Sequence, residues 1–253
     1  MKSAIRLTLA ALALPLTLSA CSDDAATGEG GAVVTNEPFD PVAAPEGQQW
    51  SQMAEVTPEG GFRIGNPDAP LKLIEYASHS CPHCATFSEE ATDDIHAYVD
   101  TGVLSFELRN QIHDVIDLTF ATLARCGDPA TFQPLAKQGW ADLNDIFERA
   151  QANPQQMDAA MQVTDNTRFQ RIAEASGLID WFAARGISRD QAMQCLDGTD
   201  TPQQIAERSA QQSEELDVTG TPTFFLNGNK IEIEPGSSAW TQLQPVLEQA
   251  GAR

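Results

Sequence analysis

The most reactive side chains in the sequence are two cysteines separated by a proline and a histidine, Cys81-Pro82-His83-Cys84. Two thiols three residues apart at the start of a helix lie close enough to bridge, so the pair can alternate between a dithiol and a disulfide. The thiolate, not the thiol, is the form that attacks another sulfur. The motif therefore suggests thiol–disulfide exchange, in which a substrate thiolate attacks the Cys81 sulfur and expels Cys84.

The residues around this motif predict a strand before it and a helix after it. Leu71 to Tyr76 is a short apolar run that follows a turn signal, as expected of a buried strand. Beyond the motif, apolar residues recur at steps of three or four, which is typical of a helix. They are Cys84, Phe87, Ala91, Ile95 and Tyr98. Cys81 is thus expected at the helix N-terminus, where unpaired N–H groups and the positive end of the helix dipole favour a thiolate.

These positions predict different acidities for the two cysteines. Each unit by which the pKa of Cys81 falls stabilises its thiolate by about 1.4 kcal/mol, and a charged His83 would add to this. Pro82 falls in the first turn, where proline is tolerated. Cys84 shares the apolar face of the helix, so we expect it to be buried and less acidic. A stable Cys81 thiolate would make the disulfide form strongly oxidising.

Two other interpretations of the same cysteines stay open at this point. A zinc site could use Cys81 and Cys84 with His79 and His83, but ligands so close together in sequence strain a tetrahedral geometry, and the sequence has no second CxxC. A purely structural bridge is the other alternative. It would close a very short loop, which constrains the unfolded chain little.

The rest of the chain predicts one more strand, a long helical block, and a hairpin followed by a helix. Val103 to Ile112 favours a strand, and residues from about Val115 to Leu216 favour helices almost throughout. The terminal elements are expected at Thr221 to Leu226, Lys230 to Glu234 and Ser238 to Gln249, with Asn227-Gly228 as the hairpin turn. This order predicts an α/β domain over residues 55–114 and 217–253, interrupted by a helical insertion over residues 115–216.

The N-terminal residues predict export. Lys2 and Arg6 precede an apolar run from Leu7 to Leu18, which has the length of a signal peptide rather than of a membrane span. Leu18-Ser19-Ala20-Cys21 resembles the bacterial lipobox, which implies a signal peptide over residues 1–20 and lipidation of Cys21. An ordinary signal peptide with a chance cysteine is the alternative. Residues 21–54, rich in Gly, Ala, Asp, Glu and Pro, are expected to form a flexible tether.

The charge of the chain bears on its partners. The formal net charge is -21, from 36 acidic and 15 basic side chains. Such a chain repels nucleic acid, so we exclude a nucleic-acid partner. Solubility alone accounts for the acidic surface.

Two separated motifs resemble those of one known family. Glu75 to Cys84 is similar to the active-site segment of DsbA-like thiol:disulfide interchange proteins, which have a thioredoxin fold with an inserted all-helical domain. Val218 to Phe224 resembles the second motif of that family, a loop with a cis-proline. The resemblance spans about residues 55–253 and implies the same α/β thioredoxin fold here.

The resemblance also implies roles for individual residues. Cys81 would be the nucleophile and Cys84 its partner, while Pro82 and His83 tune the redox potential. Thr221 and Pro222 would face the disulfide and bind the main chain of a substrate. Glu75 matches a buried acid that relays protons near Cys84, although an ordinary carboxylate at a strand edge is the alternative. We expect His96 and His113 to be surface or packing residues.

The function implied is a dithiol oxidase of the bacterial cell envelope, facing the periplasm, which introduces disulfides into exported proteins. It would need no cofactor, and a membrane redox partner of the DsbB type would re-oxidise it. Thr221 before the proline also occurs in disulfide isomerases, so an isomerase or reductase stays open, as does a metal-binding lipoprotein. Relatives with a second, non-catalytic bridge imply that Cys126 pairs with Cys195, with two free thiols as the alternative.

Overall fold

The computed structural model of the chain describes residues 37–197 and 200–253. The predicted signal peptide, Cys21 and most of the predicted tether lie outside these residues, so lipidation of Cys21 stays a prediction. In the part of the chain that the structure describes, no helix is long and apolar enough to cross a membrane.

The core of the fold is a six-stranded sheet with the strand order β1-β2-β4-β3-β5-β6. Its strands are β1 (Ala54–Val56), β2 (Phe62–Gly65), β3 (Leu71–Ala77), β4 (Leu104–Asn110), β5 (Thr223–Leu226) and β6 (Asn229–Ile231). The two central strands, β3 and β4, are parallel, and the other neighbours are antiparallel. β3 therefore pairs on both sides, and the loop that follows it emerges from the middle of the sheet.

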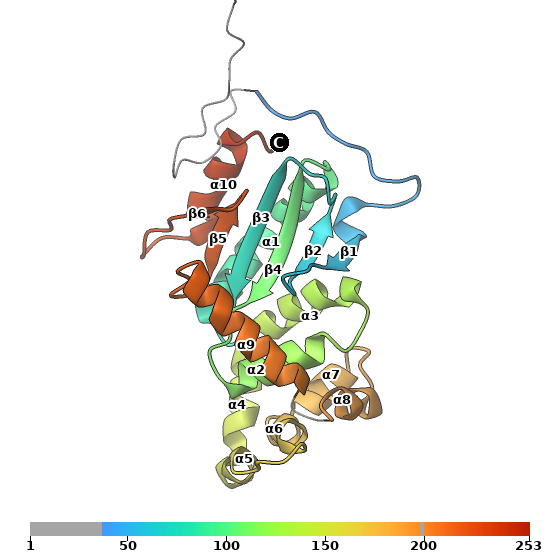
Figure 1. Cartoon of the computed structure of the whole chain (residues 1–253), viewed down its shortest axis with the longest axis vertical. Coiled ribbons are helices and arrows are strands. Elements are labelled where there is room, and N and C mark those ends of the chain that lie inside the picture. The colour runs from blue at the N-terminus through green and yellow to red at the C-terminus, as the bar shows by residue number, and fades with distance from the viewer. Residues whose placement is uncertain (1–36, 198–199) are drawn as a thin grey trace, which may run out of the picture.

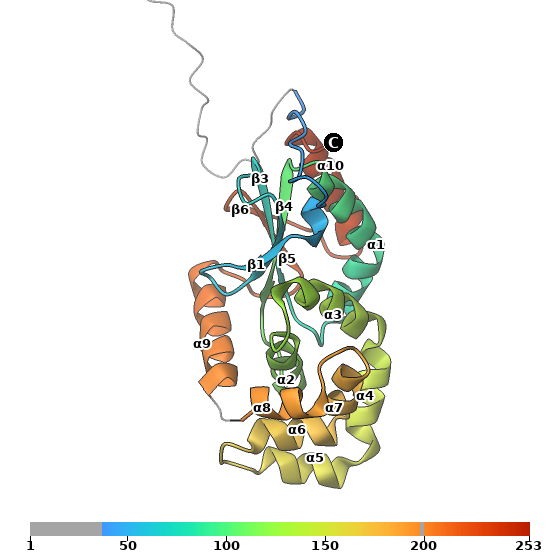
Figure 2. The ribbon, with the colours of Figure 1, turned by 90° about the vertical axis from the view of Figure 1, so that its right-hand side faces the viewer.

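Two helices cover one face of this sheet, α1 (Pro82–Asp100) and α10 (Ala239–Gln249) (Figures 1 and 2). The apolar stripe predicted from Cys84 to Tyr98 faces the sheet: Phe87, Ala91 and Ile95 pack with Leu71 and Leu73 of β3 in one buried cluster. Burying a side chain of this size stabilises the fold by about 1.5–3 kcal/mol. The stripe thus fixes the rotation of α1, and with it the direction in which Cys84 points.

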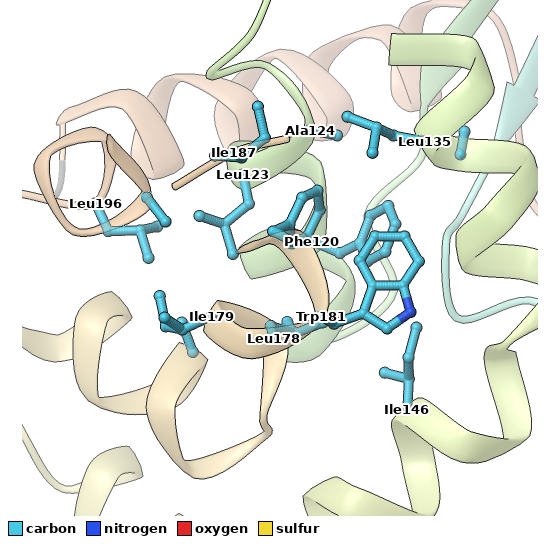
Figure 3. Close-up of a cluster of buried hydrophobic side chains, with 14 of the residues drawn as sticks. Phe120, Leu123, Ala124, Leu135, Ile146, Leu178, Ile179, Trp181, Ile187 and Leu196 are labelled. Carbon is cyan, nitrogen blue, oxygen red and sulfur yellow. The ribbon is translucent and has the colours of Figure 1, made fainter. Parts of the chain in front are cut away.

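The helical insertion runs between β4 and β5, and its hydrophobic core is continuous with residues of the sheet and with Cys81 and Cys84. Its helices are α2 (Val115–Ala124), α3 (Pro129–Ala141), α4 (Leu143–Ala152), α5 (Pro154–Met161), α6 (Arg168–Ala175), α7 (Leu178–Ala183), α8 (Arg189–Cys195) and α9 (Asp200–Glu215). Figure 3 shows Phe120 of α2 amid apolar side chains from the other helices, including Trp181 and Leu178 of α7. The predicted α/β class with a helical insertion is confirmed.

A disulfide joins Cys126, just beyond α2, to Cys195 at the end of α8, with their Cα atoms 6.0 Å apart. The two residues are separated by 69 positions in sequence. The bridge therefore closes a long loop that contains α3 to α8, and it ties the last of these helices back to the first helix of the insertion.

Three details differ from the sequence prediction. The flexible tether was placed over residues 21–54, but from residue 37 the described chain lies against the fold. Trp50 is 8% exposed, its Nε1 donates to the carbonyl of Val42 at 2.7 Å, and the Val42 N–H donates to the carbonyl of Thr101 at 2.8 Å. The sequence analysis missed these contacts because the segment is mostly polar and rich in proline, with few apolar residues.

Strands β1 and β2 were not predicted, because they are short and lie beside Gly60 and Gly61. The predicted strand from Lys230 to Glu234 is also shorter than expected, since β6 ends at Ile231. β1, β2 and β6 are each stabilised by pairing with a neighbouring strand. Their own residues show little of the alternation of apolar and polar side chains that predicts a strand.

Candidate active site

Cys81 is the N-cap residue of α1, four residues beyond the end of β3. Its backbone is extended (φ -92°, ψ 116°), and its sulfur accepts a hydrogen bond from the backbone N–H of Cys84 at 3.4 Å. Pro82 occupies the first helical turn, where its missing N–H leaves no bond unmade. Cys81 and Cys84 are free thiols in this structure, and Cys81 is 5% exposed. The predicted strand–loop–helix arrangement therefore places both sulfurs at the start of α1.

Hydrogen bonds lower the pKa of Cys81 to about 5. The largest cause is the thiol of Cys84, which donates to the Cys81 sulfur; the side chain of Thr221 and the backbone N–H groups of Cys84 and His83 act in the same direction, against burial. At neutral pH such a group is about 99% thiolate, against a few per cent for an ordinary cysteine. His83 acts here through its backbone, whereas its side chain is exposed.

Cys84 and Glu75 form the buried side of the site. The pKa of the Cys84 thiol is raised, first by burial and then by its hydrogen bond to Cys81 and by the charge of Glu75. The pKa of Glu75 is also raised, by burial and then by the negative charge of Cys81. Glu75 is 2% exposed and lies in β3, which pairs on both sides, so the alternative of a carboxylate at a strand edge is wrong. The Cys84 thiol therefore holds its proton at neutral pH, and burial favours the protonated form of Glu75.

The loop before β5 forms the other wall of the site. The peptide bond between Thr221 and Pro222 is cis, and the Cys81 sulfur lies 3.3 Å from the carbonyl oxygen of Thr221, to which it donates only when it is protonated. Thr221 and Pro222 also line a hollow of about 270 Å³ together with His83, Phe87 and Ile233. Two segments 140 positions apart in sequence thus meet at one sulfur.

The alternative zinc site is not formed. His79 is buried, packs in tilted ring contacts against Phe120 and Trp140, and has its Nε2 atom 3.1 Å from Nδ2 of Asn110. Burial and then the charge of Arg125 lower the pKa of His79 to about 3. Among the described residues, no three or more His, Cys, Asp or Glu side chains are grouped so that they could hold a metal ion. His79 is therefore a packing residue.

Two residues of the site were missed by the sequence analysis. Asp117 of α2 is buried and accepts hydrogen bonds from His79 N at 2.8 Å, from Ser78 Oγ at 2.6 Å and from His113 N at 2.9 Å. His113, expected to be a surface or packing residue, is exposed but lies beside Thr221, with its Nε2 atom 3.3 Å from Thr221 Oγ1. The one signal for Asp117 was a carboxylate on an otherwise apolar helix.

The fold and this site define a thioredoxin-type protein, and comparison with known proteins agrees. A family model described as Thioredoxin matches residues 57–248. The chain therefore belongs to the thioredoxin family, and its fold is a thioredoxin fold with a helical insertion.

Among solved structures, the chain is similar to a protein-disulfide isomerase from Novosphingobium aromaticivorans, with 28% identity and a TM-score of 0.67 over 76% of this chain and 97% of that one. It shares its fold with alpha-DsbA1 of Wolbachia pipientis, with 24% identity and a TM-score of 0.54 over 77% of this chain and 92% of that one. The predicted likeness in fold to DsbA-like proteins is thereby confirmed.

Curated sequences give the same class. A Rickettsia typhi protein named as a putative protein-disulfide oxidoreductase is 25% identical over 170 residues, which are 67% of this chain and 55% of that protein. A Rickettsia prowazekii protein of the same description matches to the same extent. The chain thus spans about half the length of these relatives.

Proposed function

We propose that the protein is a thiol–disulfide oxidoreductase that works through Cys81 and Cys84. The observation that carries the proposal is the divergence of the two acidities: the pKa of Cys81 is lowered to about 5, while that of Cys84, three residues on, is raised. A pair of this kind forms a disulfide whose two sulfurs are inequivalent, so attack and departure occur in a fixed order.

The exchange starts from the disulfide form. A substrate thiolate attacks the Cys81 sulfur, a bond forms between the two sulfurs, and the Cys81–Cys84 bond breaks. Cys84 leaves with the electron pair and takes up a proton, and we propose that the buried carboxyl of Glu75, whose pKa is raised by burial, relays this proton. A second substrate thiolate then attacks the substrate sulfur of the mixed disulfide and expels Cys81 as its stable thiolate. The substrate gains a disulfide, and the protein is left as the dithiol.

The direction of the reaction follows from the stability of that thiolate. A Cys81 thiolate that persists down to about pH 5 favours the dithiol over the disulfide, so the disulfide form is an oxidant. This supports the finer proposal, a dithiol oxidase. An isomerase is the second candidate, because the Novosphingobium protein is named as a protein-disulfide isomerase.

The redox potential separates these candidates. We expect a redox potential of about -120 mV, as for a strong oxidase, measured by equilibration with glutathione buffers. A redox potential of about -180 mV would favour the isomerase. A redox potential of about -270 mV would indicate a reductase and would contradict the proposal of a dithiol oxidase.

Substrate binding is proposed at the loop with the cis-proline. Pro222 has no N–H, which leaves the neighbouring backbone free to pair with an extended peptide. The hollow beside Thr221 and Pro222 offers room for a side chain next to the reacting cysteine. The substrates are therefore proposed to be protein thiols presented in extended segments.

The activity test uses the reduction of insulin and the oxidation of a reduced, unfolded substrate. The variant Cys81→Ser should lose at least about 100-fold in both assays, because it lacks the sulfur that forms the mixed disulfide. Cys126→Ser with Cys195→Ser is the matched control, since it removes the two other described cysteines and leaves Cys81 and Cys84 in place. Unchanged activity in Cys81→Ser would end the proposal.

A location in the cell envelope is proposed from the N-terminal residues alone. A lipid-anchored protein facing the periplasm would act on exported proteins, with re-oxidation by a DsbB-type membrane partner. Labelling with a radioactive fatty acid tests the anchor: the wild-type chain should incorporate it, and Cys21→Ala should not. Equal labelling of both chains would contradict an anchor at Cys21.

A further inference from the structure

The link between β4 and α2 places His113 against the loop that carries the cis-proline. The Nε2 atom of His113 lies 3.0 Å from Oε1 of Gln111 and 3.3 Å from Oγ1 of Thr221. Gln111 in turn donates its amide Nε2 to the carbonyl of Val218 at 2.9 Å. These contacts tie the link to both ends of the segment from Val218 to Thr221.

The contacts of Gln111 determine which nitrogen of His113 carries the proton. Because the amide nitrogen of Gln111 donates to Val218, its Oε1 faces His113 and can only accept. The Nε2 atom of His113 must therefore bear a hydrogen, and the tautomer is assigned from the network. The same N–H also points toward Thr221 Oγ1, which acts as an acceptor in that contact.

This arrangement leaves the hydroxyl hydrogen of Thr221 free for another acceptor. A hydroxyl that accepts from one side can donate on the other. The Cys81 sulfur lies 3.3 Å from the carbonyl oxygen of Thr221, and the side chain of Thr221 is among the groups that lower the pKa of the Cys81 thiol. A chain of donors therefore runs from His113 through Thr221 to the reacting sulfur.

His113 is itself held in place by the other wall of the site. Its backbone N–H donates to Oδ2 of Asp117 at 2.9 Å, and Oδ1 of the same carboxylate accepts from the backbone N–H of His79, two residues before Cys81. Asp117 is buried, so these bonds are shielded from water. One carboxylate thus fixes the position of His113 relative to the loop that leads to Cys81.

We propose that His113 is a positioning residue, whose Nε2–H orients the Thr221 hydroxyl toward the Cys81 sulfur and so stabilises the thiolate that leaves in each round of exchange. The inference rests on the proposed function and adds to its site a residue that acts on Cys81 through Thr221. His113 touches neither the substrate sulfur nor the Cys81–Cys84 bond.

The test follows the ultraviolet absorbance of the Cys81 thiolate in the reduced protein as pH is varied. His113→Ala should raise the proton affinity of Cys81 by roughly three- to tenfold, the effect of one hydrogen bond. His113→Gln should restore the wild-type midpoint, because its amide N–H has about the reach of Nε2. His96→Ala, which removes a histidine from the middle of α1, is the matched control and should leave the midpoint unchanged.

A double-mutant cycle with Thr221→Val distinguishes positioning from a general loss of structure. Once the hydroxyl is absent, His113→Ala should shift the midpoint no further. An unmoved midpoint in His113→Ala, or an equal shift in the Thr221→Val background, would overturn the inference. The titration uses no substrate, so a failed exchange assay counts against the proposed function, and an unmoved midpoint counts against His113.

Discussion

The two cysteine pairs of this protein, Cys81 with Cys84 and Cys126 with Cys195, can both form a disulfide, but their sulfurs have opposite surroundings. The sulfur of Cys81 faces donors: the Cys84 thiol, the Thr221 side chain and backbone N–H groups, which outweigh the single carbonyl contact to Thr221 O. The sulfurs of Cys126 and Cys195 both face the carbonyl oxygen of Thr122, at 3.2 and 3.8 Å. Donors stabilise a negative sulfur and an acceptor opposes it. The polarity of the neighbours thus favours a thiolate at Cys81 and opposes one at Cys126 or Cys195.

The spacing of the two pairs in sequence adds to the contrast. Closing a loop of 69 residues removes much of the freedom of the unfolded chain, whereas a bridge between residues three apart removes little. The bridge between Cys126 and Cys195 therefore contributes stability. The bond between Cys81 and Cys84 contributes little, so it can open and close without affecting the fold.

Removing the long-range bridge should give the largest effect. Cys126→Ala with Cys195→Ala is expected to lower the free energy of unfolding by about 2–4 kcal/mol, because the unfolded chain regains its freedom. Urea unfolding of the oxidised proteins measures this, with the insulin assay run alongside. The rate of thiol exchange should change less than about twofold. A large loss of exchange with unchanged stability would reverse the roles assigned to the two pairs.

The reactivity of Cys81 should follow its acidity. In the reduced protein, iodoacetamide labelling of Cys81 should rise with pH to a plateau, with its midpoint near pH 5, while Cys84 should stay unlabelled until far higher pH. Mass spectrometry of the peptides at each pH measures both. A midpoint at about pH 8.5, the ordinary pKa of a thiol, would show that the surroundings of Cys81 do not favour its thiolate. The contrast drawn between the surroundings of the two cysteine pairs would then fail.

The same shift affects stability with a definite sign. The pKa of Cys81 is lower in the folded protein than in the unfolded chain, so the thiolate stabilises the folded, reduced form. This contribution is complete above the pKa of an ordinary thiol, declines as pH falls, and is gone below about pH 5. Thermal unfolding of the reduced wild type and of Cys81→Ser should therefore differ at pH 8 and converge as the pH approaches about 4. A constant difference would contradict the shift.

A proton donor such as Glu75 is needed only beside a cysteine pair whose disulfide bond breaks and re-forms, as proposed for Cys81 and Cys84. Glu75→Gln keeps the size of the buried side chain but cannot exchange a proton with Cys84. We expect at least about a tenfold slower release of Cys84 from the disulfide, measured by stopped-flow fluorescence with a thiol substrate. Glu55→Gln, which changes an exposed carboxylate, is the control. An unchanged rate would assign Glu75 a structural role.

The parts of the fold with strong local patterns could be predicted from sequence. The apolar run of β3, the helical period of α1 and the Asn227-Gly228 turn each specify their own element, so the position of Cys81 at a helix start followed from local rules. β1 and β2 could not be predicted in this way, because their pairing partners supply most of their stability.

The supporting residues of the site were hidden for a related reason. Asp117 and His113 act through contacts with Ser78, His79 and Thr221, which are distant in sequence. The sequence correctly predicted that the pKa of Cys81 is lowered, because it placed this residue at the start of a helix. It did not predict the contribution of the Thr221 side chain, which depends on the tertiary fold. The local sequence pattern thus identified the reactive cysteine pair, whereas contacts between distant residues set the acidity of Cys81.

The first described residues of the chain and the reactive sulfur lie at opposite ends of α1. Phe39 and Val42 bond to Gly251 and Thr101, so the chain departs from the fold at the C-terminal end of α1, whereas Cys81 caps its N-terminal end. A helix of 19 residues places those two ends about 28 Å apart. Any support attached near residue 37, a bilayer or a purification resin, would therefore hold the fold at the end of α1 that is opposite to Cys81.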